Sequence, residues 1–138
     1  MSVSIQLTDD LETCLALRRA VFMDEQGVSF EDEVDGLDPK CLHLLASVSG
    51  VPGGTARIHL ADSVAKIGRV CVLRTHRGFG LGAALIRKAL EVSKPNATQA
   101  KLGAQVQALR FYETLGFTAF GPVYDDAGID HRDMIQDL

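Results

Sequence analysis

The sequence lacks tryptophan, has only two tyrosines and three cysteines, and carries no excess of basic residues. Fourteen lysines and arginines stand against 18 aspartates and glutamates, which gives a formal net charge of −4. Proteins that hold duplex nucleic acid mainly through its phosphates usually carry the opposite balance, so this class is disfavoured. A small anionic ligand remains compatible with the composition, because a local basic cluster can occur on an acidic protein.

Long apolar runs are also missing. No stretch approaches the ~20 apolar residues of a membrane-spanning helix, and the first residues do not resemble a signal peptide. The cysteines, Cys14, Cys41 and Cys71, are odd in number and lack the CxxC spacing of zinc sites and redox motifs. We therefore expect a cytoplasmic protein with reduced thiols, no metal site and no membrane contact.

The length of 138 residues, with 46% apolar and 23% charged residues, predicts one globular domain over residues 1–138. Hydrophobic periodicity predicts a helix that begins at residue 11 and further helices over 80–93 and 106–115. The expected strands cover residues 3–7, 42–49, 55–61, 64–73, 98–104, 117–123 and 131–135, with turns at 51–54 and 125–130. A β-rich first half followed by a β-α-β-α-β second half indicates a mixed α/β layer structure.

Residues 24–40 have no periodicity and contain seven acids and one lysine, which predicts a loop or a broken helix. Two interpretations fit: a solvated loop, or an acidic surface that attracts a cationic amine. The run from Glu31 to Gly36 resembles the start of a calcium-binding loop. Its twelfth position is Leu42 instead of a bidentate glutamate, so an EF-hand is excluded.

A glycine-rich loop, Arg77–Gly82, lies between a predicted strand and the 80–93 helix. Backbone N–H groups at a helix N-terminus attract anions, and Arg74, His76 and Arg77 add positive charge there. An ordinary tight connection between strand and helix is the alternative. The glycine spacing fits neither the Walker loop, which needs a lysine, nor the dinucleotide-binding GxGxxG fingerprint.

The segment Arg77-Gly78-Phe79-Gly80-Leu81-Gly82 resembles the Arg/Gln-x-x-Gly-x-Gly/Ala signature of the GNAT superfamily of N-acetyltransferases. Residues 68–73 are similar to the strand that borders the coenzyme in this family, and residues 109–117 to its later helix. Further segments resemble the ElaA/YjcF-like branch: 21–26, 103–105 and 128–131, together with Asp35 and His43. The resemblance covers about residues 20 to 134.

This resemblance implies an α/β (α+β) GNAT fold. We expect a mixed, mostly antiparallel central sheet of about six or seven strands, flanked by helices and splayed between strands 64–73 and 98–104 at a coenzyme cleft. Acetyl-CoA would be the cosubstrate, and the glycine loop would hold its pyrophosphate. The implied coenzyme-binding residues are Cys71, Val72, Leu73, Arg77, Gly78, Phe79, Gly80, Leu81, Gly82 and Phe111.

Transfer of an acetyl group to an amine needs a base for the amine and an acid for the leaving thiolate. The resemblance places Tyr112 near the coenzyme sulfur as the general acid, although its helical stripe with Leu109 and Leu115 also fits simple packing. Glu25, His43 and His131 are the candidate bases or acceptor contacts, and a water chain is an alternative. A backbone N–H near Val72 would stabilise the oxyanion.

The implied function is direct transfer of acetyl from acetyl-CoA to a primary amine of a small molecule. A non-catalytic acyl-CoA-binding sensor is the alternative, and both a monomer and a homodimer stay open. Gly103 departs from the branch pattern, in which an asparagine can stand beside the coenzyme arm. This departure removes a side-chain amide that would orient the acetyl group or the acceptor.

Overall fold

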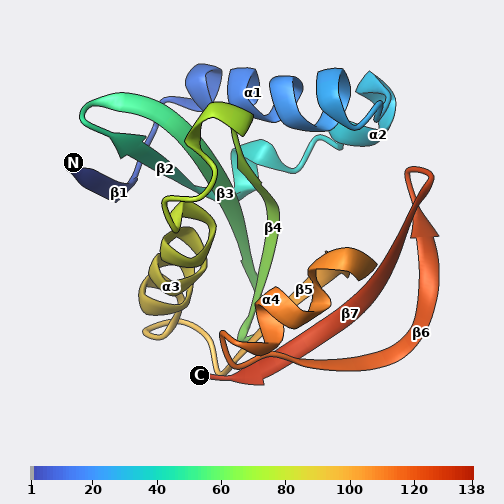
Figure 1. The fold of residues 1–138 in the computed structure, drawn as a ribbon. Coiled ribbons are helices and arrows are strands. Elements are labelled where there is room, and N and C mark those ends of the chain that lie inside the picture. Colours follow the sequence, from blue (N-terminus) through green and yellow to red (C-terminus); the bar gives the residue numbers. More distant parts are fainter. Residues whose placement is uncertain (1) are drawn as a thin grey trace.

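Seven strands in the order β1-β2-β3-β4-β5-β7-β6 form the central sheet of the computed structural model, which describes residues 2–138 (Figure 1). The strands are β1 (Val3–Leu7), β2 (Leu42–Val48), β3 (Val51–Ala61), β4 (Val64–Val72), β5 (Gln99–Gln105), β6 (Thr118–Asp126) and β7 (Ile129–Asp137). All neighbours pair antiparallel except β4 and β5, which are parallel. The expected mixed, mostly antiparallel sheet is therefore confirmed.

Helical segments connect and cover the strands. They are α1 (Leu11–Arg18) with its π-helical continuation η1 (Arg19–Glu25), α2 (Phe30–Glu33), η2 (Asp38–Lys40), η3 (Arg74–His76), α3 (Leu81–Ser93), η4 (Val106–Ala108) and α4 (Leu109–Glu113). Asp10 caps α1, because its carboxylate accepts a hydrogen bond from the Thr13 backbone N–H at 3.1 Å. None of the helices in this part of the chain combines the length and the apolar content that a membrane crossing requires.

The helices cover opposite faces of the sheet, as the alternation of side chains along β2 requires. Leu44 and Ala46 belong to the main core, which contains the buried α3 residues Leu81 and Leu85. Leu45 faces the other way and joins a smaller cluster with residues of α1, η1 and β4. Aromatic and aliphatic residues of α4 also border the main core, so α3 and α4 pack on the same side.

The structure corrects one sequence expectation about local structure and shortens another. Residues 51–54 were expected to form a turn but lie in β3, and the chain reverses at Ser49 and Gly50 instead. The glycines of this segment serve close packing: a Cβ at Gly53 would overlap the His76 ring at 2.3 Å, and one at Gly54 would lie 3.2 Å from Leu85. Helix 106–115 is also shorter than expected and begins with the 3₁₀ turn η4.

Strands β4 and β5 diverge after a short paired region. Only Val64, Ala65 and Lys66 pair with residues of β5, although β4 continues to Val72. On the other side of β4 the register with β3 shifts between Thr55 and Arg57, which indicates a β-bulge. Arg69 lies at this bulge with a φ of 52°. The splayed arrangement that the sequence predicts is therefore present.

Candidate active site

A cavity of about 550 Å³ occupies the divergence of β4 and β5. Its walls come from the segment after η1, the bulged part of β4, the end of β5, α4 and the β6–β7 hairpin, in which β7 pairs with β5 and β6 forms the sheet edge (Figure 1). Of the candidate acid and bases, Tyr112 and His131 line this cavity, whereas Glu25 and His43 do not. The fold thus brings together one candidate acid and one candidate base.

Tyr112 lies on α4 and packs edge-to-face against Phe111 and Phe117, with ring centroids 5.0 and 6.1 Å away. Burial raises the pKa of Tyr112 to about 12, and no hydrogen bond contributes to this shift. The phenol is therefore a neutral proton donor at physiological pH, positioned by its aromatic neighbours. The ring packs against the core, as the packing interpretation expects, and the side chain also lines the cavity.

His131 lies on β7, where it pairs with Tyr124 of the neighbouring strand β6. Its Nδ1 lies 2.7 Å from the Ile129 backbone carbonyl oxygen. A carbonyl oxygen only accepts hydrogen bonds, so Nδ1 carries the proton and donates it. In the neutral ring, Nε2 then has a free lone pair and is able to accept a proton.

Glu25, at the end of η1, forms a two-pronged ion pair with Arg77 of the glycine loop, with N–O distances of 2.6 and 2.7 Å. The hydrogen bonds from Arg77 lower the pKa of Glu25. A carboxylate that binds protons less readily than usual is poorly suited to act as a base near neutrality. Glu25 instead neutralises Arg77, the arginine that the family resemblance assigns to the coenzyme.

His43 is buried under η2, and its Nε2 lies 2.9 Å from the Asp38 backbone carbonyl oxygen. Its Nδ1 has no hydrogen-bond partner among residues 2–138. Cys71 is buried as well, and burial raises the pKa of its thiol to about 12. Neither residue lines the cavity, so the structure offers no support for His43 as base or for a chemical role of the Cys71 thiol in the transfer.

The glycine loop leads from η3 into α3, which is the longest α-helix of residues 2–138. Gly78 and Gly80 have φ angles of 87° and 76°, in the left-handed region that favours glycine. The first backbone amides of α3 have no acceptor within the helix, so they are free to bind an anion. Gly82 lies against Phe111, since a Cβ there would contact the ring at 3.4 Å. The backbone and Arg77 together suit a pyrophosphate.

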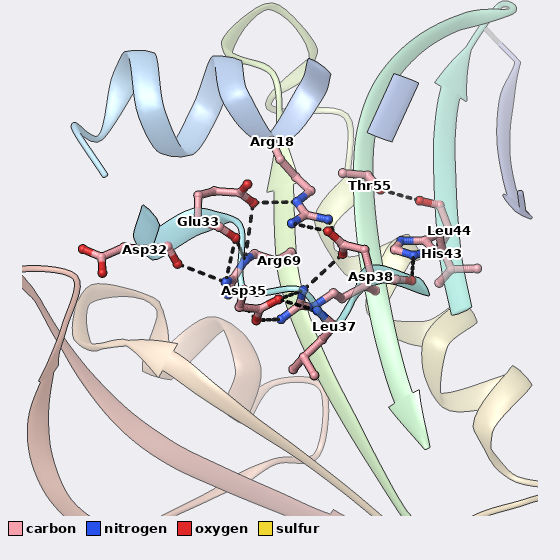
Figure 2. A network of polar contacts seen from close by, with 11 residues as sticks. Arg18, Asp32, Glu33, Asp35, Leu37, Asp38, His43, Leu44, Thr55 and Arg69 are labelled. Atoms are coloured by element: carbon pink, nitrogen blue, oxygen red, sulfur yellow. Dashed lines mark hydrogen bonds and ion pairs between the residues drawn. The ribbon is translucent and has the colours of Figure 1, made fainter. Parts of the chain in front are cut away.

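The acidic segment 24–40 is ordered by three arginines, contrary to the interpretation of a solvated loop. Arg18 is 1% exposed and binds Glu33 at 2.6 Å and Asp38 at 2.7 Å (Figure 2). Arg57 pairs with Asp35 and with Asp38. The hydrogen bonds from Arg57 hold the pKa of Asp35 well below its usual value.

Arg69 of β4 binds the acidic segment 24–40 through its side chain. Its guanidinium donates hydrogen bonds to the Glu33 and Asp32 backbone carbonyls, at 3.0 and 3.3 Å (Figure 2). Because Arg69 lies at the β-bulge, the wall of the cavity is tied directly to the bulged strand. The alternative interpretation, an acidic surface for an amine, is weakened for Glu33, Asp35 and Asp38, whose charges are already paired with arginines.

Tyr124 of β6 and Asp133 of β7 are among the polar residues of the cavity wall that were not foreseen as site residues. The Tyr124 hydroxyl donates a hydrogen bond to Asp133 Oδ1 at 2.7 Å. The sequence contained one signal for this pair, the glycine at position 103, where a side chain was expected. Residues 2–138 contain no group of three or more His, Cys, Asp or Glu side chains arranged to hold a metal ion.

Comparison with known proteins agrees with this geometry. Residues 16–138 match the family model of the acetyltransferase (GNAT) domain. The uncharacterized N-acetyltransferase YjcF of Bacillus subtilis is 35% identical over 132 residues, which cover 94% of each chain. The crystal structure of Escherichia coli ElaA has a TM-score of 0.85 at 31% identity, with 98% of this chain and 99% of that chain covered.

Two further crystal structures share this fold. An acyl-CoA N-acyltransferase from Pseudomonas aeruginosa has a TM-score of 0.87 at 30% identity, with 98% and 99% of the two chains covered. A Bacillus subtilis acetyltransferase solved in complex with CoA has the same fold, with a TM-score of 0.75 at 16% identity and 99% of each chain covered. The family match over most of the chain, together with relatives above 30% identity, establishes that this chain belongs to the GNAT acetyltransferase family, with ElaA and YjcF among its relatives.

Proposed function

We propose that the protein transfers an acetyl group from acetyl-CoA directly to the primary amine of a small molecule. The observation that carries this proposal is the position of Tyr112, a neutral phenol without a hydrogen-bond partner in the described chain, in the cavity where β4 and β5 diverge. Membership of an acetyltransferase family supports the use of an acyl-CoA. The cavity volume of about 550 Å³ lies in the usual range of small-molecule pockets, which supports a small acceptor.

The residues that would hold the coenzyme lie along β4 and at the start of α3. Arg77 and the free amides of the loop suit the pyrophosphate, with Gly78 and Gly80 giving the backbone its shape. The end of β4 and Phe111 would border the pantetheine arm. The bulge at Arg69 leaves backbone groups of β4 outside the ladder with β3, so an N–H there, rather than near Val72, is the better candidate for the oxyanion donor.

The reaction has a simple balance of atoms. The neutral amine nitrogen forms a bond to the thioester carbon, the carbon–sulfur bond breaks, the amine loses a proton and the thiolate gains one. An alkylammonium resembles lysine, with a pKa of about 10.4, whereas a thiol titrates near 8.5. Removal of the amine proton is therefore the harder step, and the thiolate needs only modest help.

We assign the two proton transfers to the candidates that line the cavity. Tyr112 would donate its phenolic proton to the thiolate, since burial keeps it protonated. His131 is the better candidate base, because its Nδ1 proton is committed to the Ile129 carbonyl and leaves Nε2 free. Glu25 and His43 lie outside the cavity and would act indirectly at most.

Calorimetry with acetyl-CoA, followed by detection of free thiol across a panel of primary amines, tests the proposal. We expect binding of acetyl-CoA and thiol release with at least one amine. Binding without release on any amine would instead favour an acyl-CoA-binding sensor. The absence of binding would contradict both functions.

A further inference from the structure

Gly103 of β5 leaves a space that the Tyr124 hydroxyl fills. A Cβ built at Gly103 would lie 2.6 Å from that hydroxyl oxygen, which is closer than real Cβ contacts allow. Gly103 is not among the glycines with a positive φ, so its backbone conformation does not require glycine. Glycine is therefore needed at position 103 because a side chain there would overlap the Tyr124 hydroxyl.

The position of Tyr124 is fixed from two sides. Its hydroxyl donates a hydrogen bond to Asp133 Oδ1 at 2.7 Å, and its ring stacks on His131 with centroids 6.0 Å apart and planes inclined by 25°. Asp133 pairs with Gly103 across β5 and β7, so the carboxylate, the phenol and the glycine form one cluster. Burial and the hydrogen bond to Asp133 raise the pKa of Tyr124 to about 12, so the hydroxyl stays protonated.

The cluster retains unused hydrogen-bond acceptors on the wall of the cavity. The Tyr124 hydroxyl oxygen donates to Asp133 and still has lone pairs, and Asp133 Oδ2 has no hydrogen-bond donor among residues 2–138. No lysine or arginine in this part of the chain forms an ion pair with Asp133. On the opposite wall, by contrast, Glu33 and Asp35 are paired with arginines. Asp133 therefore presents a negative charge, unpaired within the described chain, to the cavity on its β7 side, next to His131.

We propose that Tyr124 and Asp133 form the subsite that binds the amine of the acceptor. This inference rests on the proposed acetyl transfer and identifies the residues that recognise its acceptor. A primary amine carries two N–H groups and one lone pair. The hydroxyl oxygen and the carboxylate accept the two N–H groups, which leaves the lone pair directed away from them and free to attack the thioester. The matching acceptor is cationic in solution and loses its surplus proton within the cavity, where His131 Nε2 is the available base.

Tyr124→Phe, Asp133→Asn and Gly103→Ala test this subsite, with Val123→Ala as the control because Val123 is exposed on the same strand and does not line the cavity. For an amine that the wild type acetylates, we expect Tyr124→Phe to raise KM roughly 3- to 10-fold and Asp133→Asn roughly 10-fold or more. The Kd for acetyl-CoA, measured by calorimetry, stays within about 2-fold for all variants. The control leaves both constants unchanged.

Gly103→Ala gives a signature that a merely structural role would not produce. The new methyl group displaces the Tyr124 hydroxyl, so the single variant raises the amine KM as Tyr124→Phe does. In a Tyr124→Phe background the hydroxyl is gone, and the nearest ring atom, Cζ, lies 3.9 Å from the new Cβ, which is an ordinary contact. Gly103→Ala should therefore add little to the increase in the amine KM that Tyr124→Phe causes. Thermal unfolding of each variant verifies that it is folded at the assay temperature.

The outcomes separate this inference from the proposed function. If amines are acetylated but Tyr124→Phe and Asp133→Asn leave the amine KM unchanged, or if the effects of Gly103→Ala and Tyr124→Phe add, the subsite is refuted while the transferase function stands. If the wild type releases no thiol with any amine, the proposed function is refuted and the subsite with it.

Discussion

Replacement of Arg18 by methionine tests whether the arginine network holds the cavity wall in place. Arg18 is 1% exposed and binds Glu33 and Asp38, whose side chains are 4% and 8% exposed. Removing one partner of a buried ion pair costs about 3–5 kcal/mol, because the remaining charge loses its compensation. Arg69 and Arg57 still contact these two carboxylates, so we expect the lower end of the range, about 3 kcal/mol.

The loss should be visible in unfolding experiments. For a domain of this length, 1 kcal/mol lowers Tm by roughly 3–4 °C, so Arg18→Met should lower Tm by about 10 °C. Urea unfolding should give a lower midpoint with an unchanged slope. Arg19→Met is the matched control, since Arg19 is the exposed neighbour in the sequence and should change Tm little.

A second variant distinguishes lost ion pairing from lost packing. Adding Glu33→Gln to Arg18→Met removes the carboxylate that the first change leaves poorly compensated. The double variant should therefore be less destabilised than the sum of the two single variants. Additive effects, or a cost below about 1 kcal/mol for Arg18→Met, would refute the view that buried charge compensation stabilises this wall.

Three further predictions follow from the site. Tyr112→Phe should lower kcat 10-fold or more and leave acetyl-CoA affinity near normal in steady-state kinetics and calorimetry; wild-type turnover would exclude Tyr112 as the acid. Glu25→Gln releases Arg77 from its ion pair, so acetyl-CoA affinity measured by calorimetry at low salt should rise roughly 2- to 5-fold, and a decrease would contradict this competition. Asp35 has a pKa below its usual 3.8 in the folded state because of Arg57, so its stabilising effect is complete above about pH 4 and is lost as the pH falls further. Denaturant titrations between pH 2 and 6 should show that the free energy of unfolding decreases less steeply with falling pH in Asp35→Asn than in the wild type. Equal pH dependence of the two proteins would contradict this prediction.

Much of the fold could be predicted from the sequence, because periodicity identifies elements that bury one face. The stripe of α3 is an example, since Leu81, Leu85 and Ala89 recur at helical spacing and are all buried. The turn at 51–54 was wrong for a physical reason. Proline and glycine usually mark turns, but Gly53 and Gly54 occupy a strand where His76 and Leu85 approach too closely for a side chain.

The candidate site could be predicted only in part. The glycine loop was visible because its residues are consecutive, and Tyr112 because its surroundings resemble a known helix. Tyr124 and Asp133 lie nine residues apart on paired strands, so their hydrogen bond depends on the register of the β6–β7 hairpin. The burial of Glu33 and Asp38 likewise depends on ion pairs with Arg18, which is distant in the sequence. Composition does not reveal this partner, so the acidic residues suggested a solvated segment.

The central claim is that acetyl moves from acetyl-CoA to a primary amine within the β4–β5 cavity. The most direct measurement incubates the protein with isotope-labelled acetyl-CoA and an amine, then quantifies free CoA and labelled amide by mass spectrometry. The account predicts equal amounts of the two products, both reduced 10-fold or more in Tyr112→Phe. Release of CoA without labelled amide, or neither product despite coenzyme binding, would contradict it.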